Sequence, residues 1–395
     1  MVAIRSIIAR MENQRIAEVA RVGRERPDVI ALWFGESDVA TPDFIRQAAT
    51  AAIDEGRTFY VHRRGVLALR QELQSYLARL HGVTLDLERI TVAASGMTAI
   101  MIALQCLVDN GDNVVVVSPV WPNIVYGIEA MGGTCRHVRL DVVDGKWVLD
   151  MNKLVAACDS RTRAVFVASP GNPSGWVMER SQQQELLAFC RARDIWIISD
   201  EVYSRLVFDR EGTSPSFLEI CTPDDPLFVV QSFSKNWAMT GWRLGWLVHP
   251  AWLGDRAGDL SAINNTGATS FVQYAGIAAL SQGEAFVRSM TERCRRGRDL
   301  AHARLAAMPR VSSLLPQAAF YAFFQVEGIK DDLALAKELV RTAGVGLAPG
   351  SAFGPGNEGY LRLCFAVNRE RLSVALDRLE GALAGTRSSI SSTQG

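Results

Sequence analysis

The sequence predicts an α/β protein whose central sheet is mostly parallel and covered by helices on both faces, with a smaller α+β domain beside it. Short, continuously apolar and β-branched runs alternate with helical patterns through residues 90–248. A strand buried on both faces gives such an unbroken run, because neither face meets water. After residue 283 a long Arg-rich helical pattern begins and the strands become fewer, which favours a second domain of a different kind.

Six apolar runs are expected to form the sheet. They lie at residues 90–93, 114–117, 164–167, 195–198, 227–230 and 245–248. Residues 98–107 and 183–192 read as helices between them, and four leucines from Leu69 to Leu80 line one face of an earlier helix. Strands separated by helices are typical of parallel sheets, because the chain must cross over between parallel neighbours.

The second domain is expected to start with a helix over residues 284–308, followed by strands near 320–326 and 360–365. A final helix carries leucines at helical spacing from Leu372 to Leu383. The expected division is an N-terminal arm with part of the small domain at 1–44, a large α/β domain at 45–283, a small α+β domain at 284–387 and a flexible tail at 388–395.

The composition excludes several classes of function. The chain has 395 residues, enough for two domains, and its 42 Lys and Arg balance 42 Asp and Glu. This neutrality gives no basis for binding nucleic acid or an anionic membrane. The seven cysteines lack C-x-x-C spacing and the five histidines lack ligand spacing, so neither disulfides nor a metal site are expected. The sequence contains no uninterrupted run of about 18 apolar residues, so no membrane span is expected and the cytoplasm is the expected location.

Lys235 is the residue on which the functional prediction depends. It follows the apolar run 227–230 in Ser232-Phe233-Ser234-Lys235, whereas the other four lysines lie in polar or exposed-helix surroundings. Burial at a strand end lowers the pKa of an amine and makes it a nucleophile toward aldehydes. Taken alone, a lysine in this position is more often a surface residue, so its neighbours must decide.

Polar or aromatic groups follow each of five predicted strands. Ligands of open parallel sheets bind beyond the carboxyl ends of the strands, so these groups are expected to share one site. They are Ser95-Gly96-Met97-Thr98, Trp121, Asn172, Asp200 with Tyr203, and Ser232 to Lys235. Each alone has an ordinary reading, such as a helix N-cap for Asp200 or a turn before proline for Asn172.

This ordered set resembles the class I/II aminotransferases, the pyridoxal-phosphate (PLP) enzymes with the aspartate aminotransferase fold, fold type I. The strongest matches are Asn172-Pro173-Ser174-Gly175, Asp200-Glu201-Val202-Tyr203, Ser232-x-Ser234-Lys235 with Arg243, and Arg362 in Tyr360-Leu361-Arg362-Leu363. The resemblance covers nearly the whole chain. It implies an aminotransferase that moves an amino group between an L-amino acid and a 2-oxo acid by a ping-pong mechanism.

The resemblance also implies roles around the cofactor ring. Lys235 would hold the cofactor aldehyde as a Schiff base and later move the proton of the substrate α-carbon. Asp200 would keep the ring nitrogen protonated, because a buried carboxylate favours a nearby cation. Tyr203 and Asn172 would donate to the 3′-oxygen of the ring. Trp121 would stack on the ring face, although a tryptophan at a strand end is more often packing.

A second group of residues would hold the cofactor phosphate. Backbone amides at a helix start, hydroxyls and a guanidinium suit that anion. The implied phosphate ligands are Ser95, Gly96, Met97, Thr98, Ser232, Ser234 and Arg243. Tyr60 is the family's position for reaching the phosphate of the neighbouring subunit, which implies a homodimer with shared active sites.

The substrate would be held by Arg362, which would grip the α-carboxylate in a bidentate fork, and by the backbone of Gly35. Arg63 or Arg64 would bind a distal acidic group at the partner's site, with a solvated basic loop as the alternative. Trp33 and Phe34 would wall the entrance, which suits an apolar amino donor.

Other reactions remain open on the same residues. A PLP-dependent β-lyase, a cyclase or an oxidase of this fold would keep the same lysine, aspartate and arginines, because the protein mainly selects which bond breaks. A ligand-sensing regulator of this fold is disfavoured, because such regulators carry an N-terminal DNA-binding domain, for which no room is expected before Leu32, and because the charges balance to zero. A purely structural protein would have no reason to place this polar set at five strand ends.

Overall fold

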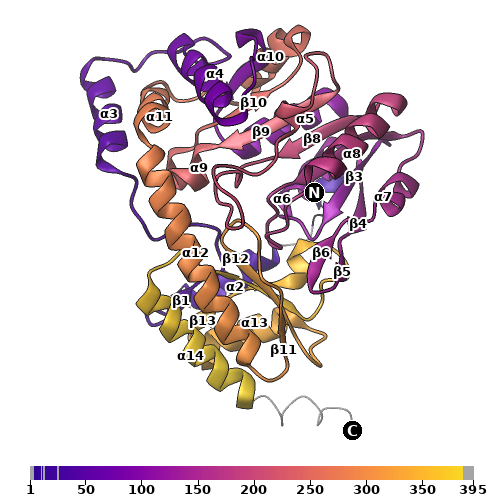
Figure 1. Cartoon of the computed structure of the whole chain (residues 1–395), viewed down its shortest axis with the longest axis vertical. Coiled ribbons are helices and arrows are strands. Elements are labelled where there is room, and N and C mark those ends of the chain that lie inside the picture. Colours follow the sequence, from indigo (N-terminus) through magenta and orange to yellow (C-terminus); the bar gives the residue numbers. More distant parts are fainter. Residues whose placement is uncertain (1–3, 10, 12–13, 25, 386–395) are drawn as a thin grey trace.

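The structure is a computed structural model that describes residues 4–9, 11, 14–24 and 26–385. A large lobe surrounds a seven-stranded sheet and a smaller lobe lies below it in Figure 1. The long helix α12 (Glu284–Ala307) runs from one lobe to the other. The expected flexible tail at 388–395 lies outside the described residues.

The large sheet has the strand order β2-β10-β9-β8-β7-β3-β4. Strand β10 runs antiparallel to both of its neighbours, and every other pairing in this sheet is parallel. The bounds are β2 (Ile90–Ala93), β3 (Asn113–Ser118), β4 (Thr134–Arg139), β7 (Thr162–Ala168), β8 (Trp196–Asp200), β9 (Leu227–Ser232) and β10 (Gly245–Val248). All six expected runs are strands, and the mostly parallel sheet is confirmed. Edge strand β4 was not expected.

Helices cover both faces of this sheet because successive side chains of a strand point to opposite faces. Val114 and Val116 of β3 pack in one apolar core, and Val115 and Val117 pack in another. The first core contains α5 (Gly96–Leu107), α6 (Asn123–Met131) and α10 (Gly254–Asn265). The second contains α3 (Asp43–Asp54), α4 (Leu67–His81), α7 (Met151–Ala157), α8 (Arg180–Arg193) and α11 (Ser270–Gln282).

The smaller lobe is an antiparallel sheet with helices packed against it, in the order β11-β12-β15-β14. Its elements are β11 (Val311–Ser313), β12 (Tyr321–Val326), β14 (Ala348–Pro349), β15 (Tyr360–Cys364), α13 (Asp332–Thr342) and α14 (Arg369–Gly385). The N-terminal helix α2 (Arg15–Gly23) packs against α13, and β1 (Ile30–Ala31) pairs with β13 (Val345–Gly346). The start of the chain therefore completes the lobe built by its end.

Packing changes from one lobe to the other along α12. Val287 belongs to the core of the large lobe, whereas Met290 and Cys294 belong to the core of the small lobe. Near the N-terminus, Trp33 packs in the small-lobe core and Ile45 in the large-lobe core. This packing agrees with divisions near residues 44 and 283, although the domain limits stay a prediction.

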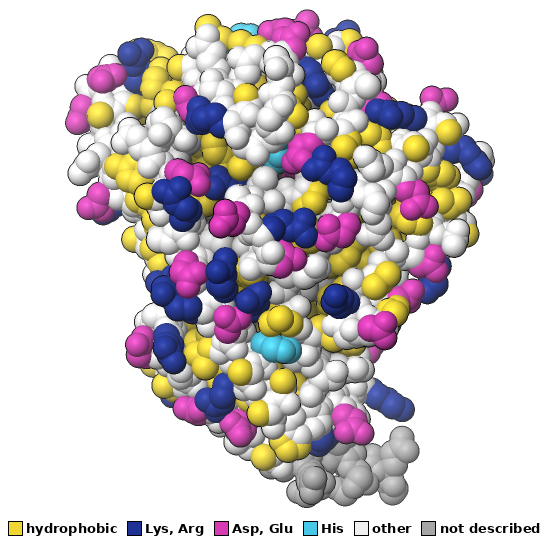
Figure 2. Space-filling view, in the orientation of Figure 1, with side chains coloured by type: hydrophobic (Ala, Val, Ile, Leu, Met, Phe, Trp, Pro, Cys, Tyr) yellow, Lys and Arg dark blue, Asp and Glu magenta, His cyan; other side chains and the backbone are white. Residues whose placement is uncertain are grey.

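The surface carries charges of both signs. On the face shown in Figure 2, basic and acidic side chains are interspersed without a large area of one sign. Within the described ranges, none of the helices combines the length and apolar character needed to cross a bilayer.

Candidate active site

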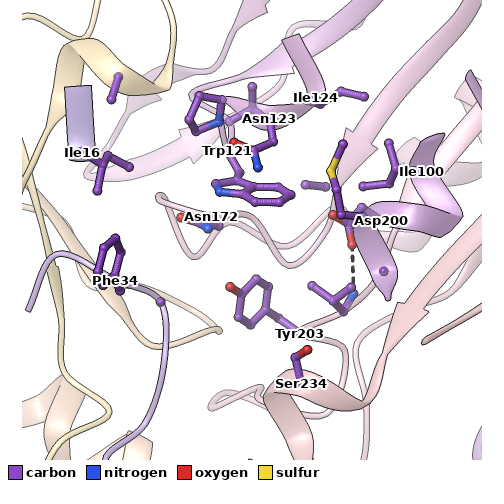
Figure 3. A pocket seen from close by; sticks show the side chains of 18 of the residues that line it. Ile16, Phe34, Ile100, Trp121, Asn123, Ile124, Asn172, Asp200, Tyr203 and Ser234 are labelled. Atoms are coloured by element: carbon purple, nitrogen blue, oxygen red, sulfur yellow. Dashed lines mark hydrogen bonds between the residues drawn. The ribbon is translucent and has the colours of Figure 1, made fainter. Parts of the chain in front are cut away.

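A cavity of about 360 Å³ lies beyond the carboxyl ends of the parallel strands, between the two lobes (Figure 3). It receives residues from all five strand ends that the sequence singled out. Those predicted residues are Gly96, Met97, Trp121, Asn172, Asp200, Tyr203, Ser232, Ser234, Lys235 and Arg243, joined from the small lobe and the N-terminal segment by Gly35 and Arg362. The structure therefore brings most of the predicted site together in one place.

Lys235 lies on α9 (Phe233–Asn236), the single helical turn that follows β9. Its Nζ donates a 2.6 Å hydrogen bond to the carbonyl of Gly35 and lies 5.7 Å from the ring centre of Tyr203. Burial lowers the pKa of Lys235 to about 8, because the ammonium form loses its hydration. An amine with this pKa is partly neutral near physiological pH and can act as a nucleophile or a base.

Asp200 is the last residue of β8 and is 8% exposed. Its Oδ1 accepts a 3.2 Å hydrogen bond from the Val202 amide, which is the dashed line in Figure 3. Burial raises the pKa of Asp200 to about 7, and this amide and the charge of Lys235 offset only part of that effect. A buried carboxyl of this kind favours a cation that faces it inside the cavity.

Helix α5 begins at the floor of the cavity with Ser95 as its N-cap. The Ser95 Oγ accepts from the Thr98 amide at 2.9 Å and shares a second 2.9 Å hydrogen bond with the Thr98 hydroxyl. Neither Ser95 nor Thr98 is among the residues that line the cavity, whereas Gly96 and Met97 are. The two hydroxyls are therefore engaged with each other at the start of the helix, and the cavity borders the first turn of the helix at Gly96 and Met97.

Three further polar groups lie beside this helix start. The Ser232 Oγ donates to Ser234 Oγ at 3.0 Å, and Arg243 approaches Ser234 Oγ at 3.4 Å while donating to the Thr240 carbonyl at 2.7 Å. Gly245 allows this close arrangement, since a Cβ there would lie 2.6 Å from the Gly96 nitrogen. Hydroxyls, a guanidinium and a helix N-terminus together form an anion-binding corner.

Arg362 lies on β15 and is only 2% exposed. Its Nη1 donates to Asn172 Oδ1 at 2.8 Å and its Nη2 donates to the Trp33 carbonyl, while its Nε is buried without a partner among the described residues. The guanidinium also lies over the Tyr321 ring, 4.4 Å from the ring centre. A buried guanidinium with a donor to spare is suited to a carboxylate.

Tyr321 was not expected in the site. It begins β12, lines the cavity and places its hydroxyl 2.6 Å from that of Tyr203. Burial raises the pKa of both phenols, so both stay protonated at ordinary pH. In the sequence Tyr321 lies within an aromatic run that reads as strand core, and no local pattern marks it as different.

The entrance of the cavity is mostly apolar. Ile16 and Ala17 of α2 and the ring of Phe34, which is 50% exposed, line it. Figure 3 shows Ile16 and Phe34 on the same side of the cavity. The expectation for Phe34 agrees with this position. Trp33 contributes to the lining but is 6% exposed and packs in the small-lobe core, so it serves the fold as well. The contribution of α2 was not foreseen, because nothing local connects it to the strand ends.

Three predicted residues lie away from the cavity of their own chain. Tyr60 is 89% exposed beside Phe59 on the surface of the large lobe. Arg63 pairs with Asp255 and Asp259, both at 2.6 Å.

Arg64 is 3% exposed and binds the Glu88 side chain, the Glu88 carbonyl and, at 3.3 Å, the Ile90 carbonyl. Its guanidinium is thus occupied inside its own lobe, and the geometry gives no support to a role in binding a distal carboxylate. Arg64 is a structural residue that ties the loop after Tyr60 to β2, which sequence reasoning could not see because burial of an arginine leaves no local signal.

Comparisons with known proteins agree with this geometry. The model of the family "Aminotransferase class I and II" matches residues 27–379. An aspartate aminotransferase of Pyrococcus horikoshii is 30% identical over 381 residues, 95% of this chain and 96% of the relative. An arginine–pyruvate transaminase of Pseudomonas aeruginosa is 35% identical over 366 residues, 91% of each protein. A solved alanine aminotransferase from Pyrococcus furiosus, 27% identical, superposes with a TM-score of 0.90 over 97% of this chain and 100% of that one.

The chain belongs to the class I and II aminotransferases. It is a PLP-dependent enzyme of fold type I that carries out transamination between an amino acid and a 2-oxo acid. The predicted family, fold, cofactor and reaction are thereby confirmed. The comparisons give no support to a lyase, a cyclase or an oxidase.

The residues of the cavity fit this cofactor. The buried carboxyl of Asp200, whose pKa is raised to about 7, has the chemistry to pair with a protonated ring nitrogen. Gly96 lets the start of α5 pack closely against Ser232, since a Cβ at position 96 would lie 3.1 Å from the serine Cβ, and the amides of a helix N-terminus suit a phosphate. The partly buried amine of Lys235 faces the same space.

Proposed function

We propose that Lys235 is the attachment point of the cofactor and also the base that carries the proton of the substrate α-carbon. The single observation that carries this proposal is the shared cavity of Lys235 and Asp200, whose pKa values burial moves in opposite directions toward neutrality. PLP supplies a ring that withdraws electrons from the substrate α-carbon. Asp200 keeps the ring nitrogen protonated, which requires its carboxyl to remain buried and charged beside that cation.

The chain's other polar groups orient the ring and its phosphate. The amides of Gly96 and Met97 would hold the phosphate together with Ser232, Ser234 and Arg243, because those groups make the anion-binding corner. Tyr203 and Asn172, which line the same cavity, would donate to the ring 3′-oxygen, and Trp121 would stack on the ring face. Ser95 and Thr98 act indirectly, since their hydroxyls hold the first turn of α5.

Arg362 binds the substrate α-carboxylate. Its guanidinium is oriented by Asn172 and by the Trp33 carbonyl, and its buried Nε has no partner in the part of the chain that the structure describes. Two residues after Trp33, the carbonyl of Gly35 accepts a hydrogen bond from Lys235 Nζ, which places this backbone group beside the reactive amine.

The apolar entrance favours an amino donor with a large apolar side chain. Ile16 and Phe34 face the cavity. Apart from Arg15 of α2, the charged residues that line the cavity are those proposed to hold the cofactor or the substrate α-carboxylate. The relatives named above act by their names on aspartate, arginine with pyruvate, and alanine, so the family membership alone does not select a donor.

The enzyme is proposed to work as a homodimer in the cytoplasm. Phe59 and Tyr60 are 82% and 89% exposed beside residues 265–271, and exposed aromatic groups of this size mark an association surface. Tyr60 would reach the partner's phosphate from there. All seven cysteines are free thiols, which suits a reducing compartment.

The test starts from the purified holoenzyme. It should absorb in the visible range, and borohydride followed by peptide mass mapping should locate the cofactor on Lys235. An amino acid alone should bleach that absorbance and a 2-oxo acid should restore it, with the fastest bleaching by leucine- or phenylalanine-like donors. Lys235→Ala should still bind PLP but lose the half-reaction, whereas Lys330→Ala, on the surface of the small lobe, should retain it. Full turnover by Lys235→Ala would contradict the proposal.

A further inference from the structure

Among the described residues, the hydroxyl of Tyr321 has one hydrogen-bond partner, the hydroxyl of Tyr203 at 2.6 Å. Tyr203 follows β8 in the large lobe and Tyr321 begins β12 in the small lobe, so the hydrogen bond joins the two lobes at the cavity wall. Tyr203 is 4% exposed and Tyr321 is 0% exposed. A short hydrogen bond without competing water has a defined direction, because each hydroxyl carries only one hydrogen.

The ring of Tyr321 is fixed on both sides. The Arg362 guanidinium lies 4.4 Å from its centre, and the Tyr203 ring meets it edge-on at 5.8 Å between centres. Its hydroxyl fills the space beside Gly35, where a Cβ would lie 1.9 Å from the phenol oxygen. The hydroxyl is therefore held in one place by packing, and a glycine at position 35 is what gives it room.

The direction of the hydrogen bond follows from the role of Tyr203. If Tyr203 gives its only hydrogen to the ring oxygen of the cofactor, it must accept from Tyr321. We propose that Tyr321 is a positioning residue, which donates to Tyr203 and so directs the Tyr203 hydrogen toward the cofactor. This inference rests on the proposed function of Tyr203. A hydroxyl that accepts one hydrogen bond becomes a stronger donor for the next, because the chain of bonds is polarised.

Several charged or titratable groups face this pair. The charge of Arg362 works to lower the pKa of both phenols, and the charge of Asp200 works to raise the pKa of Tyr203. The thiols of Cys364 and Cys294 face Tyr321. Burial raises the pKa of Tyr321 and of Cys364 and brings the pKa of Cys294 above its usual range, so none of these three ionises in the range of the test below. Lys235, whose Nζ lies 5.7 Å from the centre of the Tyr203 ring, is bonded to the cofactor in the holoenzyme under the function proposed above, which leaves the cofactor itself and Asp200 as the groups that titrate.

The test uses Tyr321→Phe in the holoenzyme, a change that removes the hydroxyl and keeps the ring under Arg362. The readout is the pH midpoint of the visible absorption change of the bound cofactor, recorded without substrate. We expect the midpoint to rise by about 0.5 to 1 pH unit, because a less polarised Tyr203 stabilises the ring oxyanion less. Tyr360→Phe is the matched control, since Tyr360 stacks on Phe323 away from the cavity, and its midpoint should not move.

A double variant shows whether Tyr321 acts through Tyr203. In the Tyr203→Phe background, Tyr321→Phe should cause no further shift, because the acceptor is already absent. An unchanged midpoint in the single variant, or equal shifts in both backgrounds, would overturn the inference. An unchanged midpoint in Tyr203→Phe alone would instead refute the proposed role of Tyr203, so the two failures are distinguishable.

Discussion

At the scale of single residues, the site depends on placing two ionisable groups in a cavity where they lose much of their contact with water. Lys235 and Asp200 both lie in the cavity, and burial disfavours the charged form of each. This environment suits the chemistry, but it should lower the free energy of unfolding of the protein without cofactor. Denaturation of the apo protein can measure that loss of stability.

We expect apo Asp200→Asn to be more stable than the apo wild type at pH 8, by on the order of 2–4 kcal/mol. The folded-state pKa of Asp200 is about 7 and the ordinary value is 3.8, so the folded state holds an extra proton between these values. Its contribution to stability falls as the pH rises through that window. The difference between the two proteins should therefore vanish toward pH 4, as urea unfolding between pH 4 and 8 will show.

Asp225→Asn is the control with the opposite sign. Burial works to raise the pKa of Asp225, but bonds from Arg191 at 2.5 Å and from the Thr222 amide at 2.5 Å outweigh it and the pKa is lowered. Losing that charge should destabilise the apo protein at pH 8. If Asp200→Asn behaved like Asp225→Asn, the carboxyl at position 200 would not be desolvated.

The sequence indicated most of the individual site residues, because they stand at strand ends in a recognisable order. Tyr321 could not be found in this way, since a tyrosine within an aromatic strand has the same local pattern as core packing. Arg64 shows the reverse problem. It stands in an exposed-looking basic loop, yet it is buried against Glu88 and β2, and only the tertiary structure reveals that burial.

At the scale of elements, Arg63 and Arg64 have different tasks in the loop between α3 and α4. Arg64→Ala should lower the free energy of unfolding by about 2 kcal/mol, because it removes a buried side chain and deprives the Glu88 carbonyl of its donor. Arg63→Ala should change it by about 0.5 kcal/mol or less, since Arg63 forms exposed ion pairs. Urea midpoints of the two variants test this difference.

The apparent affinity for 2-oxoglutarate should be the same in Arg63→Ala and the wild type, given the pairing of Arg63 with Asp255 and Asp259. A clear loss of affinity would revive the idea that Arg63 reaches a distal carboxylate across the dimer.

The elements that the sequence indicated best are the strands buried on both faces. All four valines of β3 are at most 4% exposed. A short run of β-branched apolar residues such as this one is typical of a buried strand. Strand β4 escaped prediction because it lies at the sheet edge and carries Arg136 and His137 in partly exposed positions. A polar edge strand lacks the apolar run on which the prediction depended, and only pairing with β3 reveals it.

At the scale of the whole molecule, the exposed position of Tyr60 predicts that active sites are shared between subunits. Sedimentation should show a dimer. Lys235→Ala and a second inactive variant, Tyr60→Ala, should regain activity when their subunits are mixed, because one site of the hybrid then carries neither change. Mixtures of Lys235→Ala with Asp200→Ala should gain nothing, since both changes fall within one chain's cavity. Equal outcomes for the two mixtures would argue that Tyr60 serves its own subunit.

The helix α2 has a practical consequence. Its residues Ile16 and Ala17 form part of the cavity wall, although they lie more than two hundred positions before the reactive lysine. Changes to this helix would therefore alter the entrance through which reactants reach the cavity. Engineers who wish to keep native selectivity should attach handles behind α14, and those who wish to broaden the range of accepted amines should randomise positions 14–17 first.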